Sequence, residues 1–184
     1  MRRVNDFYET PPWMTRALTK YVLIHGVVFE PCVGDHSILG ALPPSTYQRI
    51  TNDIDPNKPA NFHLDAAQDE VWDQIEPVDW VITNPPFKNP LPLEMLKRAT
   101  KVARVGVAFM LRLSFLEPTA DEKKHPRGPW LSENPPDQML VMPRHSFTGN
   151  GKSDSVTTAW MIWYKHGLES AAPRIECCYG AKGW

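Results

Sequence analysis

Short apolar runs, bounded by proline, glycine or acidic residues, alternate along this chain with amphipathic stretches. Runs of this length that are rich in β-branched and aromatic residues are typical of strands buried in a parallel sheet. The pattern predicts strands at residues 27–30, 49–56, 80–82, 105–111, 139–142 and 157–164, with a short third element at 62–67. The alternation indicates an α/β protein.

Apolar residues at helical spacing predict helices between these strands. We expect them at residues 12–21, 37–41, 66–75 and 91–102. Before the first helix, Thr10 is a candidate cap, and Pro11 and Pro12 suit the first turn because no backbone hydrogen bond is needed there. Phe7 and Tyr8 form either a hydrophobic staple on this helix or part of a loop that closes over a ligand.

Residues 116–138 form a proline-rich, charged insertion between two predicted strands. A loop of this length in a compact domain is usually functional or disordered. Its candidates for holding a nucleic-acid backbone and stacking a base are Lys123, Lys124, His125, Arg127 and Trp130. A mobile loop with no partner is the alternative.

The composition is that of one globular domain spanning residues 1–184, with 42% apolar and 22% charged residues. No apolar run approaches the length of a membrane span and no signal-peptide core follows Met1, so we expect a cytoplasmic protein without a membrane partner. Cys32, Cys177 and Cys178 match neither a disulfide framework nor a zinc pattern, and we interpret them as reduced and structural. The net charge of −1 argues against a large nonspecific phosphate-binding surface, although local basic clusters remain possible sites.

A carboxylate lies in each of the first three predicted elements. Glu30 ends the first strand and leads into a turn with Gly34, the local form of a nucleoside-binding α/β crossover. Asp53 follows about 20 residues later, where a carboxylate commonly binds ribose hydroxyls. Asp65 lies within the third element, and two compatible roles are open to it: an acceptor for an adenine amine and a cap of the following helix. Asp53 and Asp55 could instead only end their strand.

The stretch Asn84-Pro85-Pro86-Phe87 ends the strand predicted at residues 80–82. Two prolines make the chain stiff and leave its carbonyls available as acceptors. The side-chain oxygen of Asn84 and the carbonyl of Pro85 suit the two hydrogens of an exocyclic amine, while Phe87 can stack on the ring that carries it. A proline-bounded turn is the alternative for this stretch alone.

Taken in order, these motifs resemble those of the S-adenosylmethionine-dependent N6-adenine DNA methyltransferases, over about residues 7–164. The resemblance implies a Rossmann-like, doubly wound sheet of seven strands with the last antiparallel. It implies S-adenosylmethionine as the cofactor, no metal, and DNA, or alternatively RNA, as the partner. The implied catalytic residues are Asn84, Pro85, Pro86 and Phe87. The implied cofactor-binding residues are Tyr8, Thr10, Glu30, Pro31, Gly34, Asp53, Asp65 and Asn84, and the substrate-binding residues are Phe87, Lys123, Lys124, Arg127, Phe147 and Lys152.

The chain departs from the family pattern at two points. His36 stands where the family usually has a second small residue, so it would either crowd the cofactor or lie aside. Only about twenty residues follow the last predicted strand, which is too few for a recognition domain, and the chain is expected to be a small stand-alone catalytic domain such as a phage or mobile element carries. The same motif also serves methyltransferases of RNA bases and of protein glutamine, and an inactive nucleic-acid-binding relative is a further alternative.

Overall fold

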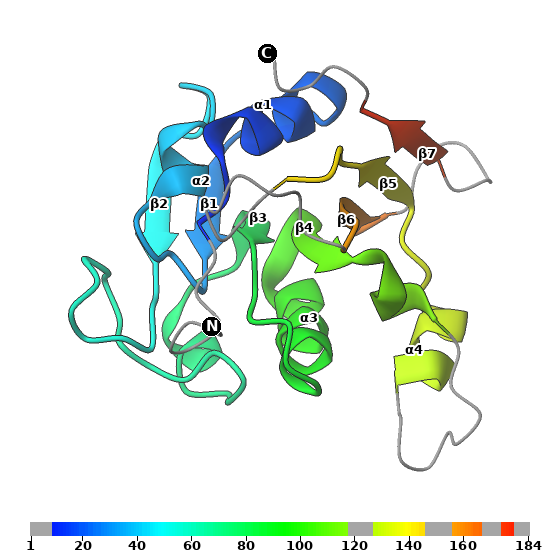
Figure 1. Cartoon of the computed structure of the whole chain (residues 1–184). Coiled ribbons are helices and arrows are strands. Elements are labelled where there is room, and N and C mark those ends of the chain that lie inside the picture. The colour runs from blue at the N-terminus through cyan, green and yellow to red at the C-terminus, as the bar shows by residue number, and fades with distance from the viewer. Residues whose placement is uncertain (1–8, 118–126, 146–155, 167–173, 179–184) are drawn as a thin grey trace.

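The computed structural model describes residues 9–117, 127–145, 156–166 and 174–178. In these residues one seven-stranded sheet has the strand order β2-β1-β3-β4-β6-β5-β7 (Figure 1). The strands are β1 (Val27–Glu30), β2 (Gln48–Thr51), β3 (Val78–Thr83), β4 (Ala103–Arg112), β5 (Gln138–Val141), β6 (Thr158–Tyr164) and β7 (Arg174–Cys177). Among these strands only β6 is antiparallel to its neighbours, β4 and β5.

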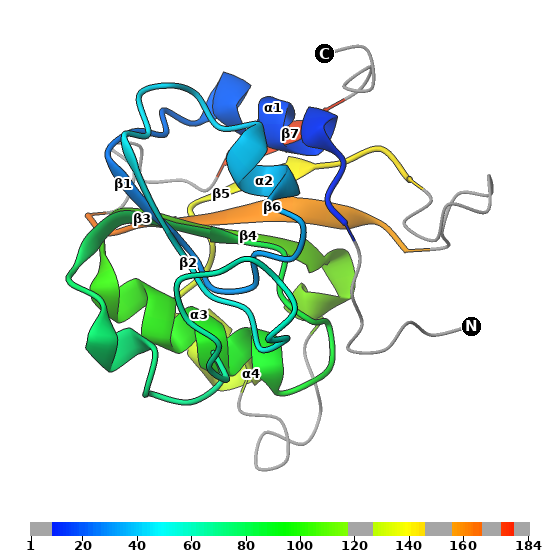
Figure 2. The same ribbon diagram turned by 90° about the vertical axis from the view of Figure 1, so that its left-hand side faces the viewer.

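Helices cover both faces of the sheet, as Figure 2 shows with the sheet seen from its edge. On one face lie α1 (Pro12–Tyr21) and α2 (Ser37–Gly40), and on the other α3 (Leu91–Val102) and α4 (Arg127–Glu133). Alternate strand residues supply the two cores: Trp80 and Ile82 pack with the α1 side, whereas Val81 packs with α3. This period of two is expected of strands buried on both faces.

The predicted α/β class and doubly wound sheet are confirmed. Helices α1 and α3 have the bounds predicted for them, because each has a continuous apolar face over its whole length. The N-cap of α1 is Pro11, and no side chain caps this helix, so the capping role expected of Thr10 is wrong. Short 3₁₀ turns, η2 (Trp72–Gln74) and η3 (Leu113–Leu116), complete the described elements.

The third predicted strand, at residues 62–67, is reduced to one bridge between Asn52 and Phe62. The Asn52 side chain replaces the missing ladder, because its Oδ1 accepts from the Leu64 amide at 3.0 Å and its Nδ2 donates to the Leu64 carbonyl at 2.9 Å. The α-helix expected at residues 66–75 is also wrong, since only η2 forms there.

Two other elements were not anticipated. Strand β7 pairs in parallel with the outer edge of β5, and its largely exposed side chains left no apolar run to signal it. Helix α4 lies within the predicted loop at residues 116–138, where Trp130 packs toward Trp163 with ring centroids 6.4 Å apart. No helix in the described parts of the chain is long and apolar enough to cross a membrane.

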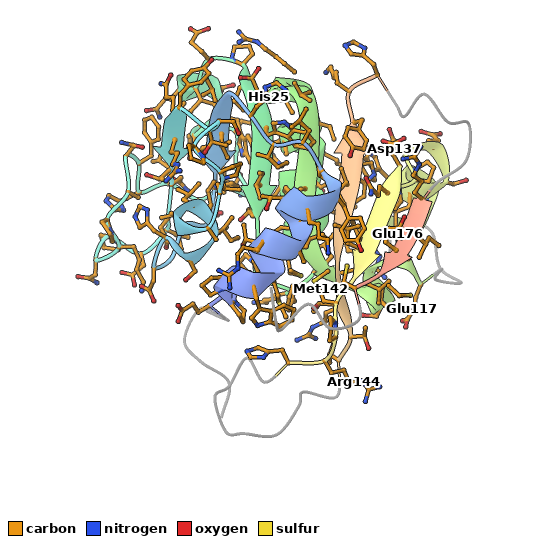
Figure 3. All side chains as sticks on the ribbon, turned by 90° about the horizontal axis from the view of Figure 1, so that it is seen from above. His25, Glu117, Asp137, Met142, Arg144 and Glu176 are labelled. Atoms are coloured by element: carbon orange, nitrogen blue, oxygen red, sulfur yellow. The ribbon has the colours of Figure 1, made fainter. Side chains whose placement is uncertain are left out.

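The carboxyl ends of the parallel strands meet at one edge of the sheet. Figure 3 shows Met142, which follows β5, together with Glu117 and Arg144 at this edge, and His25 and Asp137, which precede strands, at the opposite one. Ligands of open α/β sheets bind outside the carboxyl edge.

Candidate active site

A cavity of about 650 Å³ opens at the carboxyl ends of β1, β2 and β3. This volume lies in the range of small-molecule sites. The cavity brings together most of the predicted catalytic and cofactor-binding residues: Thr10, Glu30, Pro31, Gly34, Asp53, Asp65, Asn84, Pro85, Pro86 and Phe87. Residues from separate predicted motifs therefore share one site.

The turn after β1 is held by Asp53. Gly34 has a φ of 54°, in the left-handed region that favours glycine. Its amide donates to Asp53 Oδ2 at 2.8 Å, and Asp53 Oδ1 accepts from the Asp55 amide at 2.9 Å. Asp53 thus has the structural role that was its alternative, while the remaining lone pairs of both oxygens can still accept from a ligand.

His36 lies aside from the cavity. Its backbone is left-handed, with a φ of 61°, and its Nε2 donates to the Pro59 carbonyl at 2.5 Å. It is not one of the residues that line the cavity, although Gly34, Asp35 and Ser37 are. The side chain that departs from the family pattern therefore points toward the Pro59 segment.

The side chain of Glu30 is buried, and one of its carboxyl oxygens lacks a hydrogen-bond donor among the described residues. Its side chain is 1% exposed, and within the described residues Oε2 has no hydrogen-bond partner. Burial raises the pKa of Glu30 well above its ordinary value, nearby Asp53 raises it further, and a hydrogen bond from the Leu39 backbone opposes the rise. A cationic ligand group in the cavity would stabilise the ionised form.

The three cysteines are free thiols. Burial is the main cause that raises the pKa of Cys32, and Asp53 and Glu30 add to it, so this thiol stays protonated beside the cavity. Burial also raises the pKa of Cys178 to about 11. Across the described parts of the chain, His, Cys, Asp and Glu side chains form no group of three that could hold a metal ion.

Asn52 is a structural support that sequence reasoning missed. It is completely buried, and its Nδ2 donates to the Pro31 carbonyl as well as to that of Leu64, both at 2.9 Å. It therefore joins the turn after β1 to the segment that carries Asp65. At this strand end the sequence predicted a role for the neighbouring Asp53. A single asparagine beside it carries no motif, so Asn52 was not predicted.

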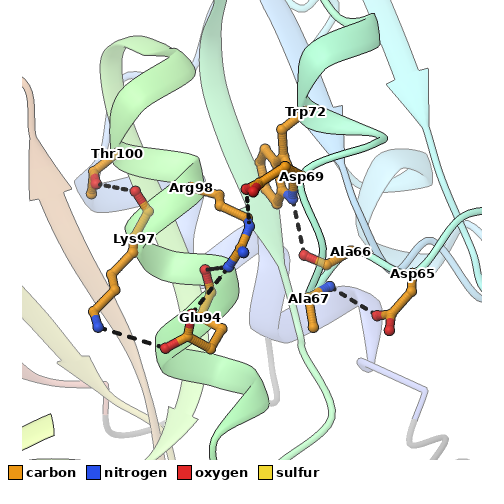
Figure 4. Close-up of polar contacts among 9 residues, drawn as sticks. All are labelled: Asp65, Ala66, Ala67, Asp69, Trp72, Glu94, Lys97, Arg98 and Thr100. Atoms are coloured by element: carbon orange, nitrogen blue, oxygen red, sulfur yellow. Dashed lines mark hydrogen bonds and ion pairs between the residues drawn. The ribbon is translucent and has the colours of Figure 1, made fainter. Parts of the chain in front are cut away.

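Asp65 begins a tight turn, since its Oδ1 accepts from the Ala67 amide at 2.9 Å (Figure 4). Trp72 Nε1 fixes this turn by donating to the Ala66 carbonyl at 2.9 Å. Arg98 of α3 adds an ion pair to Asp69 at 2.7 Å. Asp65 thus caps a tight turn, because the α-helix that it was expected to cap does not form, and it also lines the cavity.

Asn84 follows β3 and meets the segment that precedes α1. Its Nδ2 donates to Thr10 Oγ1 at 3.0 Å, and Thr10 is only 3% exposed. The Thr10 hydroxyl therefore contacts the predicted catalytic amide instead of capping α1. The two prolines after Asn84 stiffen the backbone, and both line the cavity.

Phe87 lies under a guanidinium group. The Arg112 Cζ atom is 4.8 Å from the centroid of the Phe87 ring, within the range of a cation–π contact. Arg112 ends β4, and its position as a cation closing an apolar strand was the only sequence signal available. The prediction of substrate-binding residues did not include it.

Arg127 is the only member of the predicted basic cluster that lies in the described residues. Its Nη1 donates to Asn89 Oδ1 at 3.3 Å. Asn89 is two residues after Phe87, so the start of α4 lies beside the predicted catalytic motif. The other predicted residues Tyr8, Lys123, Lys124, His125, Phe147 and Lys152 lie outside the described residues.

Comparison with known proteins gives structural neighbours only: no family model matches the chain, and no curated protein does. A Listeria monocytogenes protein assigned as a class I S-adenosylmethionine-dependent methyltransferase has a TM-score of 0.65 at 12% identity, covering 97% of this chain and 68% of its own. A Pyrococcus horikoshii protein assigned as an RNA methyltransferase has a TM-score of 0.62 at 16% identity, with 88% and 87% covered.

A third neighbour is the methyltransferase subunit of a type I restriction-modification system from Streptococcus thermophilus. Its TM-score is 0.60 at 16% identity, and the match covers 89% of this chain and 45% of that one. At sequence identities this low, the structural similarity establishes the fold alone. The chain has the class I methyltransferase fold, with its cavity at the carboxyl edge of the sheet.

Proposed function

We propose that this protein transfers a methyl group from S-adenosylmethionine to the N6 amino group of adenine in DNA. The observation that carries the proposal is that one cavity is lined both by the turn from Glu30 to Gly34 and by the run from Asn84 to Phe87. The first suits a nucleoside with a charged tail, and the second suits an acceptor amine. The class I methyltransferase fold supports this pairing.

The cavity residues fit S-adenosylmethionine chemically. Glu30 presents a buried carboxylate oxygen that lacks a partner in the described residues, which suits the ammonium of the methionine part. Gly34 leaves space for close approach beside it, Asp53 accepts from ribose hydroxyls, and Asp65 accepts from the adenine amine. Thr10 lines this end of the site, and we expect Tyr8, which lies outside the described residues, to help close it.

When bound, the cofactor supplies a methyl group made electrophilic by its positive sulfur. The protein's own contribution is positioning and hydrogen bonding. Because Asn84 Nδ2 donates to Thr10, Asn84 Oδ1 is the amide atom that accepts one amine hydrogen, and the Pro85 carbonyl accepts the other. These bonds draw the lone pair of the nitrogen out of conjugation, and one amine proton passes to solvent.

The acceptor adenine has to leave the base stack, because its amine is inaccessible to a buried methyl donor inside a duplex. Phe87 then stacks on the extruded base, with Phe147 as a second candidate. The Streptococcus thermophilus neighbour acts within a restriction-modification system, which supports DNA as the acceptor.

An RNA base is the second candidate acceptor. The observation that favours it is the Pyrococcus horikoshii neighbour, which is assigned as an RNA methyltransferase and matches over 87% of its own length. RNA recognition would favour single strands and loops, whose bases are already accessible.

The test is transfer of radiolabelled methyl from S-adenosylmethionine to duplex DNA, single-stranded DNA, total RNA and a protein extract in parallel, with the product identified by mass. We expect N6-methyladenine in DNA. Asn84→Ala should abolish transfer while S-adenosylmethionine still binds, whereas the exposed Asn57→Ala should retain transfer. Label in RNA or protein would replace the acceptor, and transfer by Asn84→Ala would refute the role of that residue.

A further inference from the structure

Two arginines flank the segment from Phe87 to Asn89. The Arg112 guanidinium lies over the Phe87 ring, and Arg127 donates from Nη1 to Asn89 Oδ1. The two side chains come from different elements, since Arg112 ends β4 and Arg127 begins α4. The turn η3 directly follows Arg112 and contains Phe115. The Arg127 Cζ lies 5.3 Å from the centroid of the Phe115 ring, which keeps the two arginines near the same loop.

Both guanidinium groups have donors that the described residues do not satisfy. The Nε atoms of Arg112 and Arg127 are buried without hydrogen-bond partners there, and neither arginine forms an ion pair with a described carboxylate. Among the described residues, Arg127 donates only to the Asn89 amide oxygen and, at 3.5 Å, to the Glu117 carbonyl. Because the Nε atoms are buried, an external acceptor would contact the accessible part of each guanidinium, and both arginines are only partly buried.

Arg98 shows how this chain treats a structural arginine. Its guanidinium pairs with Asp69 at 2.7 Å and with Glu94 at 3.2 Å, and it also donates to the Glu94 carbonyl. Arg112 has no comparable partner among the described residues, and its Cζ instead lies 4.8 Å from the centroid of the Phe87 ring. A cation–π contact restrains the guanidinium, and a guanidinium without a carboxylate partner can still make bidentate contacts to a phosphate.

Both arginines lie next to residues of the cavity wall but outside the cavity itself. Phe87 and Lys88 line it, but neither Arg112 nor Arg127 does, so the guanidinium of Arg112 covers Phe87 from outside. Because Arg112 covers one face of the Phe87 ring, the other face is the one that can stack on a base in the cavity. The two arginines therefore flank the Phe87 end of the cavity wall.

We propose that Arg112 and Arg127 bind the phosphodiester groups next to the acceptor nucleotide, with Phe87 stacked between Arg112 and the base. This inference rests on the proposed function and names the chemistry of its substrate: a polynucleotide held by its backbone within one nucleotide of the modified base. A net charge of −1 gives little general attraction to nucleic acid, so binding depends on this local pair. Lys88 adds a third cation at the cavity wall.

The test measures how oligonucleotide affinity depends on salt. Fluorescein-labelled adenine-containing oligonucleotides, as duplex DNA, single-stranded DNA and RNA, are titrated with the protein by fluorescence anisotropy over a series of salt concentrations. Arg112→Gln and Arg127→Gln should each reduce the slope of log affinity against log salt by about 0.7 to 0.9, the effect of one lost phosphate contact. At 0.1 M salt each should weaken binding by about five- to tenfold.

The matched control is Arg104→Gln. Arg104 is an exposed cation of the same strand, at its opposite end, about 26 Å from Arg112 along β4. It should leave the slope unchanged. Arg112→Lys should keep most of the slope because the charge remains, but should weaken affinity because the guanidinium contact with Phe87 is lost. Melting temperatures confirm that each variant is folded.

The possible outcomes separate this inference from the proposed function. An Arg112→Gln slope equal to that of Arg104→Gln would overturn the inference even if methyl transfer to DNA is intact. Transfer to protein without oligonucleotide binding would also overturn it, while the methyltransferase activity would stand. Salt slopes as predicted with no methyl transfer would support the phosphate site and contradict the proposed function. The three oligonucleotides distinguish DNA from RNA as the source of the phosphodiester.

Discussion

Asn84 and Thr10 are 74 residues apart and joined by a hydrogen bond of 3.0 Å from the asparagine Nδ2 to the threonine Oγ1. The bond connects the end of β3 to the segment before α1. It determines which atom of the Asn84 amide serves as acceptor, because an amide whose nitrogen is engaged presents its oxygen elsewhere. Thr10 is therefore a positioning residue for Asn84 in the proposed reaction.

Thr10→Val keeps the shape of the side chain and removes the hydroxyl. We expect methyl transfer to fall by about tenfold to a hundredfold in kcat, corresponding to one misplaced hydrogen bond, with S-adenosylmethionine affinity changed much less. Thr10→Ser should restore most of the rate because the hydroxyl returns. Equal rates in the valine and serine variants would show that the bond does not orient Asn84.

Glu30 should make stability depend on pH. Its pKa in the folded protein is raised from an ordinary value of 4.5, chiefly by burial, so between that value and the raised pKa the native state keeps a proton that the unfolded chain has lost. The free energy of unfolding contributed by this group therefore falls as pH rises through the window, by at most about 1.4 kcal/mol per pH unit, and is constant on either side of it.

Glu30→Gln should remove this pH dependence, since glutamine does not titrate. Urea unfolding of the wild type and the variant across about pH 4 to 8 provides the measurement, with the exposed Glu70→Gln as the matched control. The variant should be the more stable of the two at the upper end of the range and should bind S-adenosylmethionine more weakly. Parallel pH curves for wild type and Glu30→Gln would contradict the assignment.

His36→Gly should leave S-adenosylmethionine affinity within about twofold of the wild type, because the imidazole points to the Pro59 carbonyl and does not line the cavity. Isothermal titration calorimetry is the measurement. A large gain in affinity on removing the side chain would mean that His36 obstructs the cofactor after all.

Gly106→Ala should destabilise the sheet by about 1 to 3 kcal/mol. An added Cβ would lie 2.7 Å from Trp80 and 2.9 Å from the Trp163 carbonyl, and both neighbours belong to buried strands that cannot easily shift. Gly40→Ala is the matched control, since no atom lies within 4 Å of its added Cβ. Chemical unfolding that gives equal stabilities for the two variants would contradict the close packing.

Hydrophobic period and local turn chemistry determined much of this protein from the sequence alone. Helices α1 and α3 follow from apolar faces repeated at helical spacing, and the strand before Asn84 follows from an apolar run that ends in two prolines. These signals are contained within a few consecutive residues. Glu30, Asp53 and Asn84 were predicted as site residues in the same way, from polar residues near the ends of predicted strands, and Gly34 was predicted from the turn after the first strand.

Tertiary structure decided what depends on contacts between distant segments. The Asn52 side chain replaces a strand ladder at Leu64, so the third predicted strand does not form. Strand β7 is held by pairing to β5, without an apolar run of its own. The contact of Arg112 with Phe87 also requires β3 and β4 to be neighbours. Local periodicity cannot predict such pairings, because they depend on how distant segments of the chain pack together. They determine which polar groups meet at the cavity.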